Sequence, residues 1–278
     1  MLKKVSLILI IFILSTFTPA FAYDKYAGYE IPVDIELNGG FIKCAKKPFL
    51  VDGSTYIPLR AFADAIGAGI TWDEASQTAT MIKDNHKFEF CSDNDYCIID
   101  GVKREYSSIN RDFFTFIPVR IISETLNYTV EWDNDYFTVK ITAPDVEVPE
   151  LCCDYSYTYE DILYLGKIAM LESGSSGLEM KIGICNTIVN RVNSPIFPNT
   201  VKEVIFDTNY GTQFPPAHTD RINNTPSTEC IIAAKCALNG VNLAGNSLYF
   251  ISTKAAPSSW AHKNRTYYTT IGNTNFYE

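Results

Sequence analysis

Two motifs recur in the first half of the chain with the same offset of 60 residues (118 − 58 and 132 − 72). Tyr56-Ile-Pro-Leu-Arg60 returns as Phe116-Ile-Pro-Val-Arg120, and Ile70-Thr-Trp-Asp73 returns as Val130-Glu-Trp-Asp133. A sequence that repeats at a fixed period folds the same supersecondary unit more than once. Each unit is therefore expected to run from a strand through a tight turn into a short helix, and then into a Trp-containing strand and a further strand.

The first half is thus predicted to be a two-repeat, β-rich α+β module, with short helices at 61–66 and 121–126. Two pairs of side chains stand at equivalent positions of the units. Arg60 and Arg120 are expected to bridge turns within each unit, and Trp72 and Trp132 to anchor the core rather than to bind a ligand.

These signatures resemble the copper amine oxidase N-terminal-like domain over about residues 30–142. Despite that name a copper site is not expected, because this half contains one histidine, His86, whereas copper and zinc sites generally use several. The resemblance implies a surface-binding or positioning module. Residues 23–150 hold 12 Lys and Arg against 22 Asp and Glu, a net charge of −10, so binding to an anionic glycan would need hydrogen bonds or stacking.

The N-terminus has the pattern of a secretory signal peptide over residues 1–22. Lys3 and Lys4 precede the apolar run Leu7 to Leu14, and Ala20-Phe-Ala22 provides a small-residue cleavage site. No later stretch has the length of a spanning helix. The mature protein is therefore expected to be exported, without a transmembrane anchor, and extracellular or associated with the cell wall or spore. Neither half is basic, which excludes a typical nucleic-acid binder.

A short acidic linker is expected at 143–157, ending near the vicinal pair Cys152-Cys153. The eight cysteines of the chain show no regular framework. Cys91 and Cys97, which flank a polar loop, are the best local candidates for a disulfide, and the sequence leaves the connectivity open.

The remaining residues, 158–278, are predicted to form helices first and a small sheet after. Four helix starts carry capping residues or an initial proline: Thr158-x-x-Asp161, Ser176-x-x-Glu179, Thr200-x-x-Glu203 and Thr225-Pro226. The first helix is expected over 159–172, and the second ends near Val192. Strands are expected at 248–252 and 267–271.

Glu172 closes the first of these helices, directly before the small-residue turn 173–177. It shares a helical face with Leu165, Ile168 and Ala169, so its carboxyl is expected to be partly withdrawn from water. Such a carboxyl has a raised pKa and can donate a proton near neutral pH. The alternative, from position alone, is a last-turn glutamate that faces solvent.

Residues 160–277 resemble the SleB-type cell wall hydrolase family, which includes spore cortex-lytic enzymes. The matching blocks are spread over the whole domain: Leu171-Glu-Ser173, Ile188-Val-Asn-Arg191, Phe197-Pro-Asn-Thr-Val201, Gln213-Phe214, Thr225-Pro-Ser227, Ala237-Leu-Asn-Gly240, Leu248-Tyr-Phe250 and Thr270-Ile-Gly-Asn273. The resemblance implies a mainly helical, lysozyme-like and lytic-transglycosylase-like domain that cleaves peptidoglycan between muramic acid and glucosamine units. It also implies that Glu172 is the catalytic acid.

The chain departs from the family at one point, since many members carry a Gly-Glu pair where this chain has Ser175-Ser176. Glu179 matches a family glutamate, with a helix-capping role as the alternative. Four further residues are candidates for binding sugar rings or their polar groups: Gln213, Phe214, Tyr249 and Trp260. Trp260, in a polar loop, is the expected exposed platform, whereas Tyr249 is more typical of a core residue. Arg191 is expected to be structural.

Other chemistries have less support. A cysteine peptidase or amidase would need Cys185 with His218 or His262, but Cys185 lies in an apolar helical run without an adjacent base. The two histidines are 44 residues apart (262 − 218) and form no zinc motif, so neither a metal nor another cofactor is expected.

The leading hypothesis is an exported enzyme whose partner is peptidoglycan. It would cleave the glycan strand of spore cortex or cell wall, by lytic transglycosylation or by hydrolysis, through Glu172. The alternative is a non-catalytic wall-binding or spore-coat protein.

Overall fold

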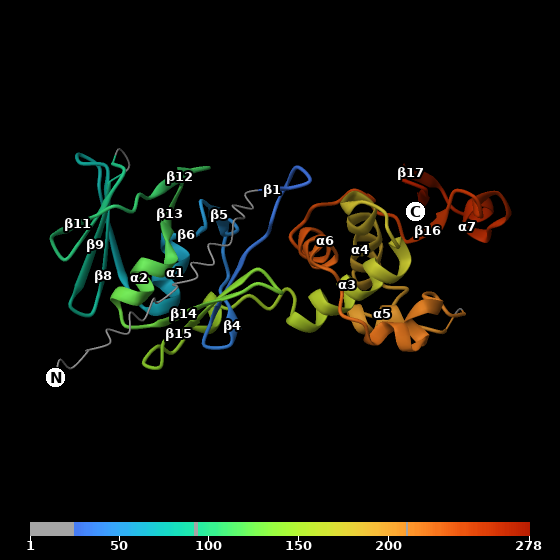
Figure 1. Ribbon diagram of the computed structural model, residues 1–278, viewed down its shortest axis with the longest axis horizontal. Helices are drawn as coiled ribbons and strands as arrows, with labels where there is room; N and C mark the ends of the chain where they lie inside the picture. The colour runs from blue at the N-terminus through green and yellow to red at the C-terminus, as the bar shows by residue number, and fades with distance from the viewer. Residues whose placement is uncertain (1–24, 92–93, 210) are drawn as a thin grey trace, which may run out of the picture.

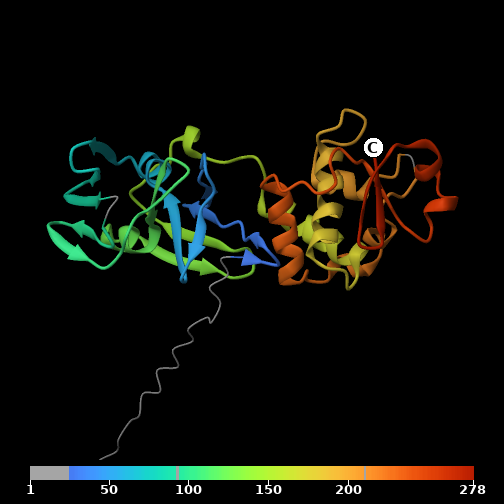
Figure 2. The same ribbon diagram turned by 90° about the horizontal axis from the view of Figure 1, so that it is seen from above.

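The chain folds into two lobes that lie side by side along the long axis of the molecule (Figure 1), and Figure 2 shows the same lobes from above. The computed structural model describes residues 25–91, 94–209 and 211–278, so the predicted signal peptide, residues 1–22, lies outside the described part. The first lobe is rich in strands and the second in helices, which confirms the predicted α+β class. No helix within those ranges is long and apolar enough to cross a membrane.

The two repeat units meet in one four-stranded sheet of the first lobe. Its strand order is β12-β13-β6-β5, with bounds Ile109–Arg111, Phe114–Pro118, Ser54–Pro58 and Phe49–Val51. The two Ile-Pro motifs pair directly and antiparallel, with Ile117 opposite Ile57. Each motif strand runs into a helix, α1 (Leu59–Ile66) or α2 (Val119–Thr125), as predicted. The sequence repeat is therefore also a structural repeat.

Each unit builds a second sheet from its Trp-containing strand. The sheet of the first unit has the order β11-β10-β9-β8-β7, with bounds Val102–Arg104, Cys97–Ile99, His86–Cys91, Thr78–Lys83 and Gly69–Asp73. The sheet of the second unit has the order β14-β15-β3-β4, with bounds Thr129–Asp133, Thr138–Thr142, Asp34–Leu37 and Gly40–Phe41. A hairpin of β1 (Lys25–Tyr26) and β2 (Tyr29–Glu30) precedes them. Both Trp strands, β7 and β14, lie at sheet edges.

The two repeat tryptophans have different environments. Trp72 is 47% exposed, so its predicted role as a core anchor is wrong. The edge strand β7 turns its tryptophan to solvent, and the indole Nε1–H donates to Glu74 Oε2 at 2.7 Å. Trp132 is half-buried and packs against the hydrophobic core, with an edge-on contact to Phe137.

Helices form the core of the second lobe, and a small sheet follows them. The helix bounds are Tyr159–Ser173 (α3), Leu178–Val192 (α4), Val201–Phe206 (α5), Thr228–Leu238 (α6) and Trp260–Asn264 (α7). The sheet has the order β16-β18-β17, with bounds Tyr249–Ser252, Thr274–Tyr277 and Tyr267–Ile271. The sequence patterns do not predict β18 and α7. The sheet packs closely on α4, because a Cβ at Gly183 would lie 2.8 Å from Phe276 Cζ.

Capping side chains set two of the predicted helix starts. Thr158 accepts from the backbone N–H of Asp161, and the Asp161 carboxylate accepts from the N–H of Thr158, which is the predicted capping box of α3. Thr200 accepts from the N–H of Glu203 at the start of α5. Both caps are local patterns that a sequence can show.

Two other helix starts differ from the prediction. The capping box at Ser176 is wrong, because α4 begins after Gly177, which has no side-chain cap. The carbonyl oxygen of Ser176 instead accepts from the ammonium of the buried Lys181. Helix α6 begins after Ser227, two residues later than the predicted start at Thr225.

The predicted linker, residues 143–157, packs on the first lobe. It contains a 3-10 turn, η1 (Glu150–Cys152). The N–H of Lys43 donates to the carbonyl of Cys152 at 2.8 Å, and Val146 and Val148 pack against the core of the first lobe. The connection is therefore ordered and not a loose tether.

The side chain of Lys235 on helix α6 reaches from the second lobe into the first. The ammonium of Lys235 is buried and forms an ion pair of 2.9 Å with Asp34 on β3. It also donates to the carbonyl oxygens of Tyr136 and Phe137. The Tyr157 hydroxyl donates to the same Asp34 at 2.7 Å. These contacts fix one lobe against the other.

All eight cysteines lie in the described residues, and none of them is in a disulfide there. Cys91 ends β9 and Cys97 begins β10, which places the predicted pair on neighbouring strands. Backbone pairing joins these two strands.

Candidate active site

A hollow of about 390 Å³ lies where the end of α3 faces the sheet of the second lobe. We call it the α3 hollow. Its lining comes from α3, α4, the small sheet and the loops between them: Glu172, Ser173, Met180, Arg191, Gln213, Phe214, Tyr249, Phe250, Ile251, Ser252, Ala255, Ala261, Asn273 and Thr274. Four predicted site residues, Glu172, Gln213, Phe214 and Tyr249, thus meet at one place.

Glu172 lies in the last turn of α3 and lines the hollow. Its Oε1 atom is buried and has no hydrogen-bond partner in the described structure. Burial raises the pKa of this carboxyl above its ordinary value, and the Arg221 guanidinium opposes the rise. The position agrees with the partly withdrawn carboxyl expected from the helical face, and not with the solvent-facing alternative.

The chain turns sharply just after the acid. Gly174 caps the C-terminus of helix α3 with φ 58° and ψ −124°, a conformation that is strained for residues other than glycine. The Ser175-Ser176 turn that follows brings no large side chain beside Glu172. The buried Lys181 fixes this turn, since its ammonium donates to Ser176 and lies 3.3 Å from Glu229 Oε2.

Arg191 forms part of the wall although it is 4% exposed. Its Nε donates to the carbonyl of Leu248 at 2.8 Å, and the guanidinium lies 4.7 to 5.5 Å from the ring centres of Phe197, Phe214 and Tyr249. Burial lowers the pKa of Arg191 to about 10. The predicted structural role accounts for the Nε contact. It does not account for Nη1, a terminal nitrogen that is buried without a hydrogen-bond partner among the described residues.

Polar atoms without partners concentrate at this site. The Oγ atom of Ser173 is buried and unpaired, like Glu172 Oε1 and Arg191 Nη1. Buried polar groups normally find partners, and leaving one unmatched costs roughly 1–3 kcal/mol. Three such atoms belong to residues that line the hollow, and they provide hydrogen-bonding capacity that a ligand can satisfy.

Gln213 and Phe214 occupy different parts of the hollow. Phe214 is 1% exposed and forms a solid apolar wall. The Gln213 side chain is half-buried and donates to the carbonyl of Gly211 at 3.0 Å, so its amide oxygen remains available. The pair therefore places one apolar surface and one polar group at the hollow.

Aromatic rings continue from the hollow to the surface. Trp260 is 56% exposed, as predicted, and its ring centre lies 5.7 Å from that of Tyr249. The Arg265 guanidinium lies 4.8 and 4.9 Å from these two rings. Tyr249 is half-buried and lines the hollow, so it is not the plain core residue that its pattern suggested. Trp260 itself lies outside the lining, beside Ala261.

Glu179 does not line the α3 hollow. Its carboxylate is exposed and accepts from the Tyr29 hydroxyl of the first lobe at 3.5 Å. The structure therefore separates this candidate from the other site residues.

The alternative chemistries gain no support from the described residues. No group of three or more His, Cys, Asp or Glu side chains there could hold a metal ion. Cys185 is buried, which raises the pKa of its thiol, and its Sγ donates to the backbone carbonyl of Leu165 at 3.8 Å. His218 packs on Phe206 and His262 on Tyr277, so neither activates this thiol.

The fold and the hollow together define a two-domain α+β protein with a single withdrawn carboxyl facing an aromatic-lined site. Residues 36–141 match the family model of the copper amine oxidase N-terminal domain. Residues 175–277 match the model described as Cell Wall Hydrolase. Both predicted resemblances are therefore confirmed, and the one to cell wall hydrolases lies in the second lobe. Glu172 lies just ahead of the matched range.

The chain is also similar to curated spore cortex-lytic enzymes. It is 30% identical over 117 residues to that of Oceanobacillus iheyensis, covering 42% of this chain and 40% of the relative. It is 32% identical over 104 residues to that of Bacillus cereus, covering 37% of this chain and 39% of the relative. The chain thus spans about two fifths of the length of these relatives.

Two solved structures are similar to the second lobe. The catalytic domain of the germination-specific lytic transglycosylase SleB from Bacillus anthracis is 29% identical, with a TM-score of 0.41, covering 45% of this chain and 99% of that one. The catalytic domain of the Bacillus cereus SleB protein gives the same identity, coverage of this chain and TM-score, and 94% of it is covered.

Proposed function

We propose that the protein is an exported enzyme that cleaves the glycan strand of peptidoglycan, in spore cortex or cell wall, between muramic acid and glucosamine units. The observation that carries this proposal is the buried, unpartnered Glu172 Oε1 in the α3 hollow. The similarity to spore cortex-lytic enzymes supports the substrate class. Export rests on the sequence of residues 1–22.

A single carboxyl can carry out this reaction. Its raised pKa keeps Glu172 protonated further toward neutral pH, so it can donate a proton to the glycosidic oxygen as the bond breaks. The carboxylate that results then accepts a proton from the 6-hydroxyl of the muramoyl unit, whose oxygen closes a 1,6-anhydro ring. If water takes the place of this hydroxyl, the same carboxylate accepts its proton and the product is hydrolytic.

The rest of the hollow suits a sugar chain. Tyr249 gives a surface on which a sugar ring stacks, Phe214 backs the hollow, and Trp260 extends the aromatic surface outward. Arg191 Nη1 and Ser173 Oγ supply a hydrogen-bond donor and a hydroxyl inside the hollow. We infer that these groups position the glycan, while Glu172 performs the proton transfers.

The test compares two glutamates of the same lobe. Turbidity of purified spore cortex and of vegetative wall is followed with wild type, Glu172→Gln and Glu179→Gln. Loss of a general acid typically costs 10²–10⁴-fold in rate, so Glu172→Gln is expected to clear suspensions at least roughly 100-fold more slowly. Glu179→Gln, outside the hollow, is expected to clear them at the wild-type rate.

Equal clearing by wild type and Glu172→Gln contradicts the role of Glu172. No clearing by any of the three proteins, with binding to the wall retained, supports the non-catalytic alternative instead. Mass spectra of the released muropeptides separate the two reaction outcomes, since anhydro ends show transglycosylation and reducing ends show hydrolysis. The wall that is solubilised identifies the substrate.

A further inference from the structure

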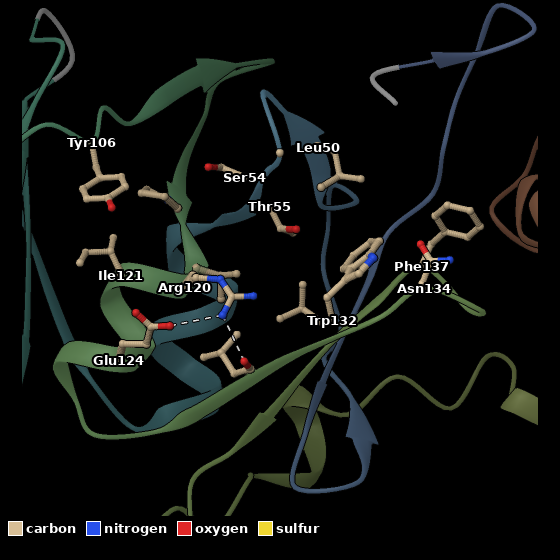
Figure 3. Close-up of a pocket in the computed structure, with 15 residues that line it drawn as sticks. Leu50, Ser54, Thr55, Tyr106, Arg120, Ile121, Glu124, Trp132, Asn134 and Phe137 are labelled. Atoms are coloured by element: carbon tan, nitrogen blue, oxygen red, sulfur yellow. Dashed lines mark hydrogen bonds and ion pairs between the residues drawn. The ribbon is translucent and has the colours of Figure 1, made fainter. Parts of the chain in front are cut away.

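A second hollow, of about 340 Å³, lies in the first lobe between the two repeat units. Figure 3 shows it between the β5–β6 turn, helix α2 and strand β14, with Tyr106 and Trp132 on opposite sides of the space. We call it the repeat hollow. Its volume falls in the range of roughly 300–1,000 Å³ that is typical of small-molecule sites. The proposed lytic reaction makes no use of it.

The walls of the repeat hollow combine a fixed aromatic ring with aliphatic side chains. Trp132 makes an edge-on contact with Phe137, with ring centres 6.2 Å apart, so core packing holds its indole in place. Leu50 and Val139 add aliphatic surface. A preformed surface of this kind favours the C–H face of a sugar ring, which stacks on aromatic side chains.

The arginine of this hollow is already engaged. Arg120 Nη1 donates to Glu124 Oε1 at 3.3 Å and to the carbonyl of Val130 at 3.1 Å, the two dashed lines in Figure 3. The second of these bonds is the bridging role predicted for Arg120. The pair is neutral as a unit, and residues 23–150 carry a net charge of −10. An anionic ligand is therefore disfavoured, and a neutral ligand fits.

The two repeat units differ in the residue that stands two positions after the tryptophan. In the first unit the Trp72 indole N–H donates to Glu74 at 2.7 Å. The position 60 residues later (134 − 74) holds Asn134, and the Trp132 N–H has no hydrogen-bond partner among the described residues. The second unit thus keeps the tryptophan, removes the carboxylate that occupies its N–H, and leaves an amide at the edge of the hollow.

We propose that the repeat hollow binds an N-acetylglucosamine unit of a neutral glycan segment. The sugar ring stacks on Trp132, its hydroxyls bond Ser54 and Thr55, and its acetamido group bonds Asn134. This inference deepens the proposed function, because peptidoglycan presents such units between its muramic acids. The first lobe then holds a glycan strand while Glu172 cuts one. A stem peptide fits less well, since it carries carboxylates that the acidic lobe repels.

The test makes Trp132 the single tryptophan of the full-length chain. The variant Trp72→Phe/Trp260→Phe/Glu172→Gln removes the other two tryptophans and blocks turnover. Titration with chitotetraose, an oligomer of N-acetylglucosamine, is expected to change the emission of Trp132 in a saturable way. The stem tetrapeptide of peptidoglycan, titrated in parallel, is expected to leave it unchanged.

One further substitution gives the second unit the carboxylate that the first unit carries at the equivalent position. Asn134→Glu, at an exposed position, is expected to capture the Trp132 N–H and to weaken chitotetraose binding roughly tenfold, because the sugar loses hydrogen bonds and meets a charge. An unchanged melting temperature shows that the fold is intact.

Absence of an emission change with chitotetraose overturns the inference. So does equal affinity with and without Asn134→Glu, or a response to the tetrapeptide alone. Because the titration needs no turnover, its result is independent of the lysis assay. The titration can show no sugar binding at Trp132 while the lysis assay shows that Glu172 is catalytic. The titration can also show binding while the lysis assay shows no role for Glu172.

Discussion

Glu172 Oε1 is held away from water without a hydrogen-bond partner, so ionising this carboxyl costs free energy in the folded state. Its folded pKa is raised, whereas an unfolded glutamate has a pKa of about 4.3. Between these two values the folded state binds more protons than the unfolded state, and the free energy of unfolding falls as the pH rises. Above the folded pKa that loss is complete.

The substitution Glu172→Gln removes this penalty. Relative to wild type, the variant is expected to gain melting temperature as the pH is raised from about 4 to about 7, as measured by thermal melts followed by circular dichroism. Glu179→Gln removes the same charge at an exposed position and serves as the control. The burial argument is contradicted if the difference in melting temperature between Glu172→Gln and wild type stays constant across this pH range.

The position of Glu172 is predictable from sequence because it depends on local features, a helical face and the turn that follows. The environment of Arg191 is not, because its contacts come from Leu248, Phe214 and Tyr249 on later segments of the chain. The one signal for Arg191 is its place in a block that resembles the family. Glu179 fits a local pattern too, yet only the fold shows that it faces the first lobe.

The end of α3 depends on one backbone conformation. Gly174 has φ 58° and ψ −124°, and an alanine there strains the backbone by about 1–3 kcal/mol. Gly174→Ala is expected to lower the free energy of unfolding by that amount, measured by urea denaturation. It is also expected to slow wall lysis, because the strain is relieved by moving the turn next to Glu172.

Gly177 provides the matched substitution three residues later. Its φ of −68° and ψ of 174° suit any residue, and a Cβ there meets nothing within 4 Å. Gly177→Ala is expected to cost under about 1 kcal/mol, from the poorer helix cap alone. Equal losses of unfolding free energy in Gly174→Ala and Gly177→Ala would show that the backbone conformation of Gly174 does not cause the destabilisation.

Among the elements, those fixed by local chemistry are the ones that sequence predicts. The helices that follow the Ile-Pro motifs, and the cap at Thr158, need only their own residues. Strand β18 (Thr274–Tyr277) is missed because it is short and becomes a strand through pairing on both sides with β16 and β17. The cap predicted at Ser176 fails because the N-cap residue of α4 is Gly177, one position later.

At the scale of the whole molecule, a buried ion pair between Lys235 and Asp34 contributes to the contact of the two lobes. Lys235→Met leaves Asp34 buried without a counter-charge, and breaking a buried pair from one side typically costs about 3–5 kcal/mol. Adding Asp34→Asn is expected to recover part of this loss, because the amide oxygen still accepts from Tyr157. Urea denaturation of both variants measures the effect. A double variant no more stable than Lys235→Met contradicts it.

The contact between the two lobes also affects how the protein unfolds and whether the chain can be divided into two stable parts. Ile31, Phe137 and Tyr157 belong to one hydrophobic cluster with the helices α3, α4 and α6. Dividing the chain between the two matched ranges, 36–141 and 175–277, therefore cuts through a shared interior. Because the two lobes share this cluster, we expect them to unfold together and each half to lose stability when it is separated from the other.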